Sequence, residues 1–304
     1  MVACGLALRG RMAAISTSGG LPGIAPVLVA VAINTAANGV VVTAWRGMLR
    51  ASGAQISTRA AAWVWSVSQL ARYTIGAAQV GGRAVVGRRY GLSATAGAVT
   101  TLVEVAWQAA ITATLVLATV PWWLSGASSL AWIVWIGAIP AMVLAMGLIW
   151  PELVLRAVAV MLDRSPWKRL AGGRRMTGTL HHVRFHRADA ARVTVLYALN
   201  SGLRLAAFLT LFVAVGGSLN SDGLRAVGAY GLGQLVGRLA VFAPGGLGPR
   251  EGATALAVAP AVGGGPALVL VASVRLAELL GEALFAGLAR VARPTPDTPP
   301  PPSP

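Results

Sequence analysis

The chain has 304 residues, of which 56% are hydrophobic and only 11% are charged. A soluble protein of this length needs more polar residues to cover its surface, and several apolar runs here reach the roughly 20 residues that a helix needs to cross a bilayer. The composition therefore excludes an ordinary soluble protein and predicts an integral membrane protein with several spans.

The formal net charge of +16 would suggest a nucleic-acid partner in a soluble protein. Here the basic residues lie between the apolar runs, and Lys and Arg in short loops stay on the cytoplasmic side of a membrane. We therefore interpret the charge as an orientation signal and expect no nucleic-acid partner. The single cysteine, Cys4, excludes an intramolecular disulfide and a cysteine metal cluster.

The first half of the chain alternates apolar runs with basic links. The second run is interrupted by Arg59 and Arg72 and is followed by a basic link that contains Arg83, whereas the third contains Glu104. Apolar segments are expected at residues 26–45, 56–82, 93–120 and 130–150. Together, residues 26–150 form the predicted first membrane half.

The second half begins after a basic stretch. Residues 151–192 carry nine Lys and Arg and are predicted to form a cytoplasmic loop. The second membrane half, residues 193–290, then has long apolar runs at 193–215, 223–243 and 267–289, with a short one at 253–262. Residues 291–304 form a proline-rich tail that we expect to be disordered, with the C-terminus in the cytoplasm.

The charges also restrict the topology. Because the run at 56–82 has basic residues on both sides, its simplest form is a re-entrant hairpin that enters from the cytoplasm. Residues 223–262 then form a hairpin that enters from outside, with "PGGLGPRE" near its turn. Two half-spanning hairpins from opposite faces are typical of an inverted repeat.

A faint internal echo supports that repeat, because Gln69 matches Gln234 and Arg83 matches Arg250. The predicted fold is an all-α integral membrane protein, a polytopic helical bundle with two re-entrant hairpins and an inverted repeat. This topology leaves the basic residues of the N-terminal segment, residues 1–25, on the outer side. We therefore expect that segment to follow a missing first span, lost through a misassigned start codon.

The stretch "PGGLGPREGA", preceded by "GQLVGRLAVFA", resembles the signature of the lysylphosphatidylglycerol synthase transmembrane region, also called the flippase-like family. The segments "AWRGMLRASG", "GGRAVVGRRYGLS" and "LVEVAW" are similar to earlier parts of that family. The likeness covers residues 27–289. It implies a helical bundle with re-entrant helices that moves a lipid, such as an aminoacylated phospholipid, between leaflets.

The resemblance also assigns site residues. Arg83 and Glu104 fall where the family places its first-half polar residues, while the main motif is matched by Pro244, Gly245, Gly246, Gly248, Arg250 and Glu251. The first-half motif departs from the family pattern, with Gln79, Val80 and Ala84 in place of a proline and an acidic residue, and with Val105 after Glu104. The first hairpin is therefore expected to be less active or to accept a different lipid.

The Arg250–Glu251 pair lies at membrane depth if the hairpin prediction holds. A charge at the centre of a bilayer costs roughly 2.5–3.5 kcal/mol on insertion-based scales, so it persists only when it is paired or solvated. Glycine N–H groups, the start of a half-helix and an arginine fork together would bind an anionic lipid head group. The alternative is a tight turn in which the Arg–Glu pair holds helices together.

Other charges occur in apolar surroundings. Arg275 and Glu278 share a helix face and could simply neutralise each other, whereas Glu104 has no local partner and is expected to pair with a distant arginine. With Arg238, these residues complete the predicted head-group site. The asparagines Asn34, Asn38 and Asn200 are expected to form hydrogen bonds between helices.

Three functions remain open from the sequence. The first is a translocator in the cell membrane that moves an anionic or aminoacylated phospholipid or a polyprenyl-linked lipid and is not an enzyme. The alternatives are a membrane glycosyltransferase or lipid-modifying enzyme, and a non-catalytic partner in an envelope complex. We expect no cofactor or metal, and as partners membrane lipids, further copies of the chain, or a separate lipid-synthesising enzyme, because no aminoacyl-transferase domain follows Arg293.

Overall fold

The computed structural model describes residues 21–74, 78–119, 160, 186–220, 222–240 and 243–295, and all the regular elements within these ranges are helices. The predicted span at 130–150 and most of the predicted loop at 151–192 lie outside the described residues. The described helices are α2 (Ile24–Ala51), α3 (Thr58–Ala71), α4 (Ala78–Arg88), α5 (Ala94–Thr119), α9 (Arg187–Ala214), α10 (Gly223–Leu239), the short η3 (Pro244–Gly246), α11 (Pro249–Val262) and α12 (Gly264–Val291).

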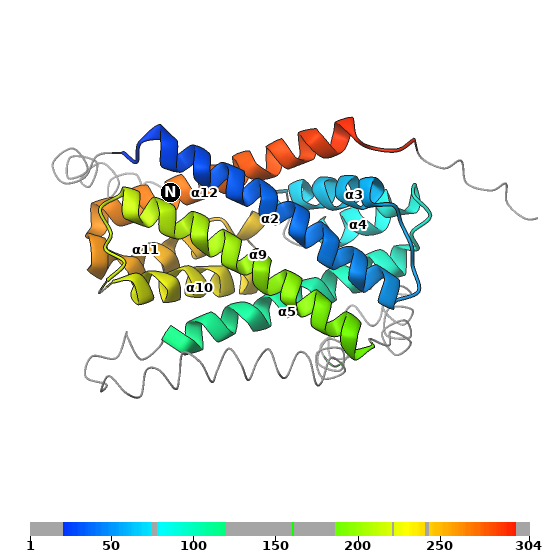
Figure 1. Ribbon diagram of the computed structural model, residues 1–304, viewed down its shortest axis with the longest axis horizontal. Coiled ribbons are helices and arrows are strands. Elements are labelled where there is room, and N and C mark those ends of the chain that lie inside the picture. The colour runs from blue at the N-terminus through cyan, green and yellow to red at the C-terminus, as the bar shows by residue number, and fades with distance from the viewer. Residues whose placement is uncertain are drawn as a thin grey trace, which may run out of the picture.

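Four long helices run along the length of the molecule (Figure 1). Three of them, α2, α5 and α9, are long and apolar enough to cross a membrane, which confirms the spans predicted at 26–45, 93–120 and 193–215. The fourth, α12, also has 28 residues, but Arg275, Glu278 and Glu282 lie in its middle. The predicted all-α membrane bundle is therefore confirmed, and its last long helix carries three buried charged side chains.

The remaining helices are short and packed in pairs, α3 against α4 and α10 against α11. With 11–17 residues each, they reach about 17–26 Å at 1.5 Å per residue, less than the roughly 30 Å of a hydrocarbon core. The helices α10 and α11 form a pair at residues 223–262, but the re-entrant position of this pair in the membrane stays a prediction. That the two pairs enter the membrane from opposite faces stays a prediction.

One sequence interpretation is wrong. The stretch "GRAVVGRR" was expected to be a basic link, but α4 extends through it to Arg88 and buries Arg83 completely. The reason is a partner far along the chain, because Glu104 on α5 neutralises this arginine inside the bundle. Similarly, α9 begins at Arg187, within the segment that was predicted as loop, and carries Asp189 in its first turn, where a carboxylate is favourable.

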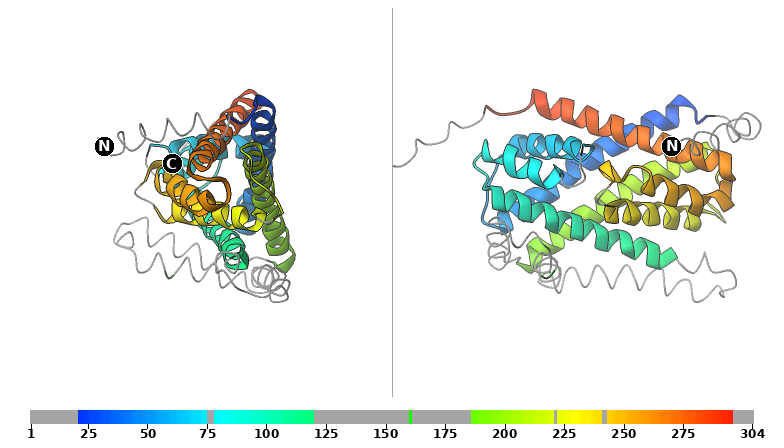
Figure 2. Two further views of the ribbon diagram at one scale, coloured as in Figure 1. Left: turned by 90° about the vertical axis from the view of Figure 1, so that its left-hand side faces the viewer. Right: turned by 180° about the vertical axis from the view of Figure 1, so that it is seen from behind.

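The two halves share one architecture. Among the described residues, each half has a long helix, a pair of short helices and a second long helix, and α2 and α9 pack side by side in opposite directions (Figures 1 and 2). The contacts between elements repeat as well: α12 packs on α2 and α3, just as α5 packs on α9 and α10. The α3–α4 and α10–α11 pairs consequently lie at opposite ends of the molecule (Figure 2).

The apolar core divides in the same way. One cluster surrounds Trp45, Trp65 and Trp107 and draws on α2, α3, α5 and α9. The other surrounds Phe208, Phe212 and related side chains of α9, α10, α11 and α12. Buried polar and charged side chains lie among these apolar residues, and they form the candidate site.

Candidate functional site

The predicted turn "PGGLGPRE" forms the tip of the second pair of short helices. Gly245 has a φ of 58°, and a Cβ there would lie 2.7 Å from the ring of Tyr73. At Gly246 a Cβ would lie 2.9 Å from the carbonyl oxygen of Gly237. Only glycine allows these approaches, so the tip is built for close contact between backbones.

The helix that follows the tip has a well-defined start. Gly248 N–H donates to Glu251 Oε2 at 2.8 Å, and Pro249 occupies the first turn of α11, where its missing N–H costs nothing. The prediction that a helix starts near Arg250 is thereby confirmed, whereas its half-spanning position in the membrane stays a prediction. Glu251 serves as part of this helix start and not as the partner of Arg250.

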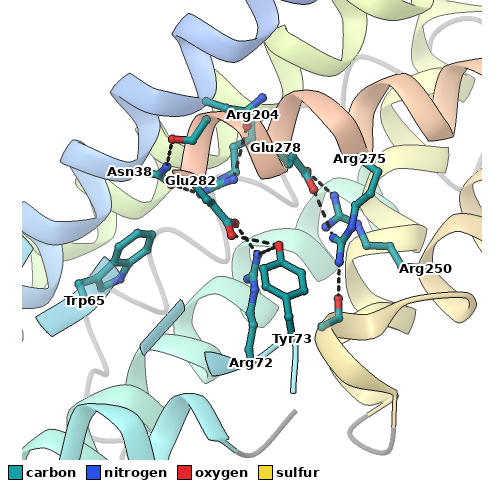
Figure 3. A network of polar contacts seen from close by, with 12 residues as sticks. Asn38, Trp65, Arg72, Tyr73, Arg204, Arg250, Arg275, Glu278 and Glu282 are labelled. Carbon is teal, nitrogen blue, oxygen red and sulfur yellow. Dashed lines mark hydrogen bonds and ion pairs between the residues drawn. The ribbon is translucent and has the colours of Figure 1, made fainter. Parts of the chain in front are cut away.

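The tip of the second half touches the first half. Gly245 N–H donates to the carbonyl oxygen of Arg72, just beyond α3, at 2.9 Å. Its own carbonyl oxygen accepts from Arg275 Nη2 on α12 at 3.1 Å. Gly245 therefore joins the end of α3, the tip and α12 through its own N–H and C=O groups, beside the side chain of Arg275 (Figure 3).

Arginines and glutamates gather behind the tip. Arg250 pairs with Glu278 on α12, while Arg275 lies 3.5 Å from Glu278 Oε2 through Nη1 and 3.6 Å from Glu251 Oε1 through Nε. The Nε and Nη1 groups of Arg275 are buried without a hydrogen-bond partner in the described part of the chain. The neutralisation of Arg275 by Glu278 that the sequence suggested is therefore incomplete, because Arg250 shares that carboxylate through Oε1 and Arg275 only approaches Oε2 without a hydrogen bond.

Sequence reasoning missed one part of this cluster. Arg72 lies 2.5 Å from Glu282 Oε1, and the hydroxyl of Tyr73 donates to Glu282 Oε2 at 3.0 Å. The Tyr73 ring faces two guanidinium groups, with centroids 5.0 Å from Arg72 and 5.1 Å from Arg275. Glu282 could have been found, because it follows Glu278 by four residues on the same helix face, but no sequence signal points to Tyr73.

Arg204 of α9 extends the cluster toward α2. It donates to the side-chain oxygens of Asn200, Asn34 and Asn38 at 3.1, 3.4 and 2.7 Å, and it forms no ion pair with a described carboxylate. Asn38 in turn donates to the carbonyl oxygen of Gly281 at 3.3 Å. The prediction that the asparagines bond between helices is confirmed for Asn34 and Asn38, whereas Asn200 bonds to Arg204 on its own helix.

The predicted site residues Arg83, Glu104 and Arg238 form a separate hydrogen-bond network around α5. Arg83 binds both carboxylate oxygens of Glu104, which confirms that Glu104 pairs with a distant arginine. Arg238 of α10 donates to Thr112 Oγ1 at 2.8 Å and to Gln108 Oε1 at 3.2 Å, and the Gln108 amide donates to Glu104. Arg83, Glu104 and Arg238 thus lie together, apart from Arg250, Glu251, Arg275 and Glu278.

A small cavity adjoins the second-half cluster. It has a volume of about 10 Å³ and is lined by Phe208, Tyr230, Arg250, Thr254, Arg275 and Glu278. That volume is about the size of one water molecule. The free space inside this polar site is therefore limited to about one water molecule.

We refer to Arg72, Arg204, Arg250 and Arg275 with Glu251, Glu278 and Glu282 as the arginine cluster. Its four arginines face three glutamates, so the described groups leave one positive charge in excess. The N-terminus of α11, with its positive helix dipole, adds to that field. This net positive charge is suited to an anion, because the described residues of the cluster include no fourth carboxylate to balance it.

Comparison with known proteins adds a family. Residues 7–285 match the family described as the lysylphosphatidylglycerol synthase TM region. No curated protein and no solved structure gives a match. Together with the apolar spanning helices and the "PGGLGPRE" tip, this match shows that the chain belongs to the lysylphosphatidylglycerol synthase TM region family, as a membrane protein of lysylphosphatidylglycerol-related lipid processes.

Proposed function

We propose that the protein moves a lipid with an anionic phosphate head group between the leaflets of the cell membrane, and that the arginine cluster binds this head group. An anionic or aminoacylated phospholipid, or a polyprenyl-linked lipid, carries the required phosphate. The observation that carries the proposal is the excess of arginine over glutamate inside an apolar bundle. An uncompensated charge at membrane depth is costly, and a bound phosphate would balance it.

Arg275 is the residue best suited to hold the phosphate. Its guanidinium group is nine-tenths buried, yet Nε and Nη1 have no hydrogen-bond partner among the described residues. A phosphate oxygen would satisfy both donors in the bidentate geometry that arginine favours. The N-terminus of α11 lies beside it, where backbone dipoles also favour a negative group.

Movement is part of the proposal, because a cavity of about 10 Å³ cannot take a head group. The α10–α11 pair is short, and its tip is attached to the end of α3 through Gly245 and to α12 through Gly245, Arg250 and Glu251. Displacement of this pair from α12 would open the arginine cluster to the lipid phase while the acyl chains stay in the bilayer. In this proposal the basic segment at 151–192 and the C-terminus face the cytoplasm.

The proposal can be tested in liposomes that contain the purified protein and a trace of fluorescent phosphatidylglycerol. We expect the protein to increase the fraction of probe that a membrane-impermeant quencher can reach. Replacement of Arg275 by Gln removes the charge and should slow transfer by about 10–100-fold, the equivalent of one lost charge-assisted hydrogen bond. The control is Arg290→Gln, on the same helix but exposed, which should transfer lipid at the normal rate.

Transfer by the Arg275→Gln variant at the normal rate would contradict the assignment of the site. Transfer no faster than in protein-free liposomes would contradict the translocator itself. Mass spectrometry of the recovered lipid separates the alternatives, because a lipid-modifying enzyme changes the mass of the lipid whereas a translocator does not. A non-catalytic partner of an envelope complex, or of a separate lipid-synthesising enzyme, would change neither the fraction of probe that the quencher reaches nor the mass of the lipid.

A further inference from the structure

The first half contains a second arginine–glutamate pair that is built like the one in the arginine cluster. Arg83 comes from α4 and Glu104 from α5, while Arg250 comes from α11 and Glu278 from α12. In both halves the arginine therefore lies on the second short helix and the glutamate on the long helix that follows. The two pairs are copies of one arrangement.

The similarity between the two arginine–glutamate pairs extends one turn further along each long helix. Gln108 follows Glu104 by four residues, as Glu282 follows Glu278. Each of these side chains bonds to the end of the first short helix of the opposite half: Gln108 accepts from Arg238 beside α5, and Glu282 accepts from Tyr73 beside α12. The repeat is thus visible in the polar contacts as well as in the order of helices.

The aromatic residues around the two pairs occupy equivalent positions but differ in size. Trp45 is the twenty-second residue of α2 and Phe208 the twenty-second of α9, while Trp65 is the eighth residue of α3 and Tyr230 the eighth of α10. In the second half, Phe208 and Tyr230 line the cavity beside Arg250. In the first half, both positions carry the larger indole ring.

The two indoles close the first copy. The Trp45 ring lies 4.7 Å from the guanidinium of Arg83, and Trp65 Nε1 donates to Glu104 Oε1 at 3.4 Å. Arg83 also donates through Nε to Ser68 at 3.1 Å, so its Nε and both of its Nη groups are bonded. Arg83, Glu104, Trp45 and Trp65 are at most 2% exposed. The first copy is buried, and every side-chain nitrogen of Arg83 is hydrogen-bonded. In the second copy, two side-chain nitrogens of Arg275 have no hydrogen bond among the described residues.

We propose that Trp45 and Trp65 close the first copy of the site, so that each chain holds one phosphate head group, in its second half only. The tryptophans supply electron-rich faces to Arg83 where a ligand would otherwise lie. With the smaller residues of the second half at these two positions, the first copy becomes a second binding site. This inference rests on the proposed function, because it takes the arginine cluster as the head-group site.

The number of bound lipids tests the inference. The detergent-solubilised full chain is titrated with phosphatidylglycerol, with phosphatidylcholine as the control for nonspecific adducts, and the bound lipids are counted by native mass spectrometry. We expect one phosphatidylglycerol per chain in the wild type and two in the Trp45→Phe/Trp65→Tyr variant. Adding Arg83→Gln to that double variant should return the number to one.

A reciprocal change closes the second copy and does not depend on the stability of the double variant. Tyr230→Trp fills the cavity beside Arg250 and should weaken phosphatidylglycerol binding by about tenfold or more, as a crowded pocket does. Two lipids on the wild type, one of them removed by Arg83→Gln, would overturn the inference. So would a folded double variant that still binds one lipid, or a Tyr230→Trp variant that binds normally.

The result also separates this inference from the proposed function. If the wild type binds no phosphatidylglycerol above the phosphatidylcholine level, the arginine cluster is not a head-group site and the proposed function fails. If it binds one and Arg275→Gln removes it, the arginine cluster stands as the head-group site, and the liposome assay decides on transfer. The number of lipids bound to the Trp45→Phe/Trp65→Tyr variant then tests only whether the tryptophans close the first copy.

Discussion

At the scale of single residues, the buried arginines differ in how completely they are paired. Arg83 is hydrogen-bonded to Glu104 and Ser68, while two donors of Arg275 lie near carboxylates without a hydrogen bond, and Arg204 bonds to asparagine oxygens among the described residues. Loss of one member of a closed pair leaves the other as an isolated buried charge, which costs far more than the pair contributes. We therefore expect the fully paired arginine to stabilise the fold and the incompletely paired arginines to be available for a ligand.

Arg83→Met is the direct test of the closed pair. We expect it to lower the free energy of unfolding by about 3–5 kcal/mol, because Glu104 would remain buried and uncompensated. Arg83→Met combined with Glu104→Leu should recover most of that loss, since both charges are removed. Thermal and denaturant unfolding in detergent measure the change.

The control for this pair is Arg88→Met, on the same helix but exposed. Its effect should stay within about 0.5 kcal/mol, as for an ordinary surface substitution. Equal stability of the Arg83 and Arg88 variants would mean that the closed pair does not hold α4 in place.

Site residues were predictable only where charge or glycine stood out in the sequence. Arg250, Glu278 and Arg275 are conspicuous because ionised groups are rare in apolar segments. Their partners were harder to predict, since Arg250 pairs with Glu278 across 28 residues and not with the adjacent Glu251. Tyr73 joins the cluster only through the fold, because a tyrosine in an apolar segment is not a signal by itself.

At the scale of elements, the α10–α11 pair depends on small residues. A Cβ on Gly237 would lie 2.9 Å from the Cβ of Arg250, and one on Gly233 would lie 1.9 Å from Thr254 Oγ1. The two glycines are four residues apart on one face of α10, the spacing that lets membrane helices approach closely. This approach places Arg250 within reach of α12.

Gly237→Ala tests the role of this contact. We expect a loss of about 1–3 kcal/mol in the free energy of unfolding, as for other overpacked sites, together with slower lipid transfer because Arg250 is displaced. Unfolding in detergent and the liposome assay report the two effects.

Gly252→Ala is the matched control on α11, because a Cβ there meets nothing within 4 Å. It should stabilise the helix by about 0.5–1 kcal/mol through the lower entropy of the unfolded chain. A Gly237→Ala variant as stable as Gly252→Ala would show that the close approach is unimportant.

The length of apolar runs predicted the helices well where few charged residues interrupt the run. Spans within α2, α5 and α9 follow from their runs of apolar residues, and the glycine–proline tip marks the start of α11. The helix α4 was missed because its charges resemble a loop, and the ion pair that buries Arg83 comes from 21 residues further along the chain. A local pattern cannot contain such a partner.

At the scale of the whole molecule, the repeat predicts which loops share a side of the membrane. The α3–α4 and α10–α11 pairs lie at opposite ends of the bundle (Figure 2), so the loops beside each pair should face opposite compartments. Exposed positions are available near both ends, at Gln55 and Arg89 beside the first pair and at Ser218 and Gly264 beside the second.

Cysteine labelling checks this prediction after Cys4, the only native cysteine, is replaced by Ser. Single cysteines at Ser218 and Gly264 should react with a membrane-impermeant reagent added from one side. Cysteines at Gln55 and Arg89 should react only from the other side. Labelling of Ser218 and Gly264 from different sides would exclude the hairpin topology of the second half.

The contact between Arg72 and Glu282 has a consequence for biosynthesis. The two residues are 210 positions apart, and the first hairpin reaches the membrane long before α12 exists. At about 5–20 residues per second, the ribosome needs on the order of 10–40 s to supply the missing carboxylate. During that interval Arg72 has no Glu282 to neutralise it, so this ion pair between the two halves forms only after α12 has been synthesised.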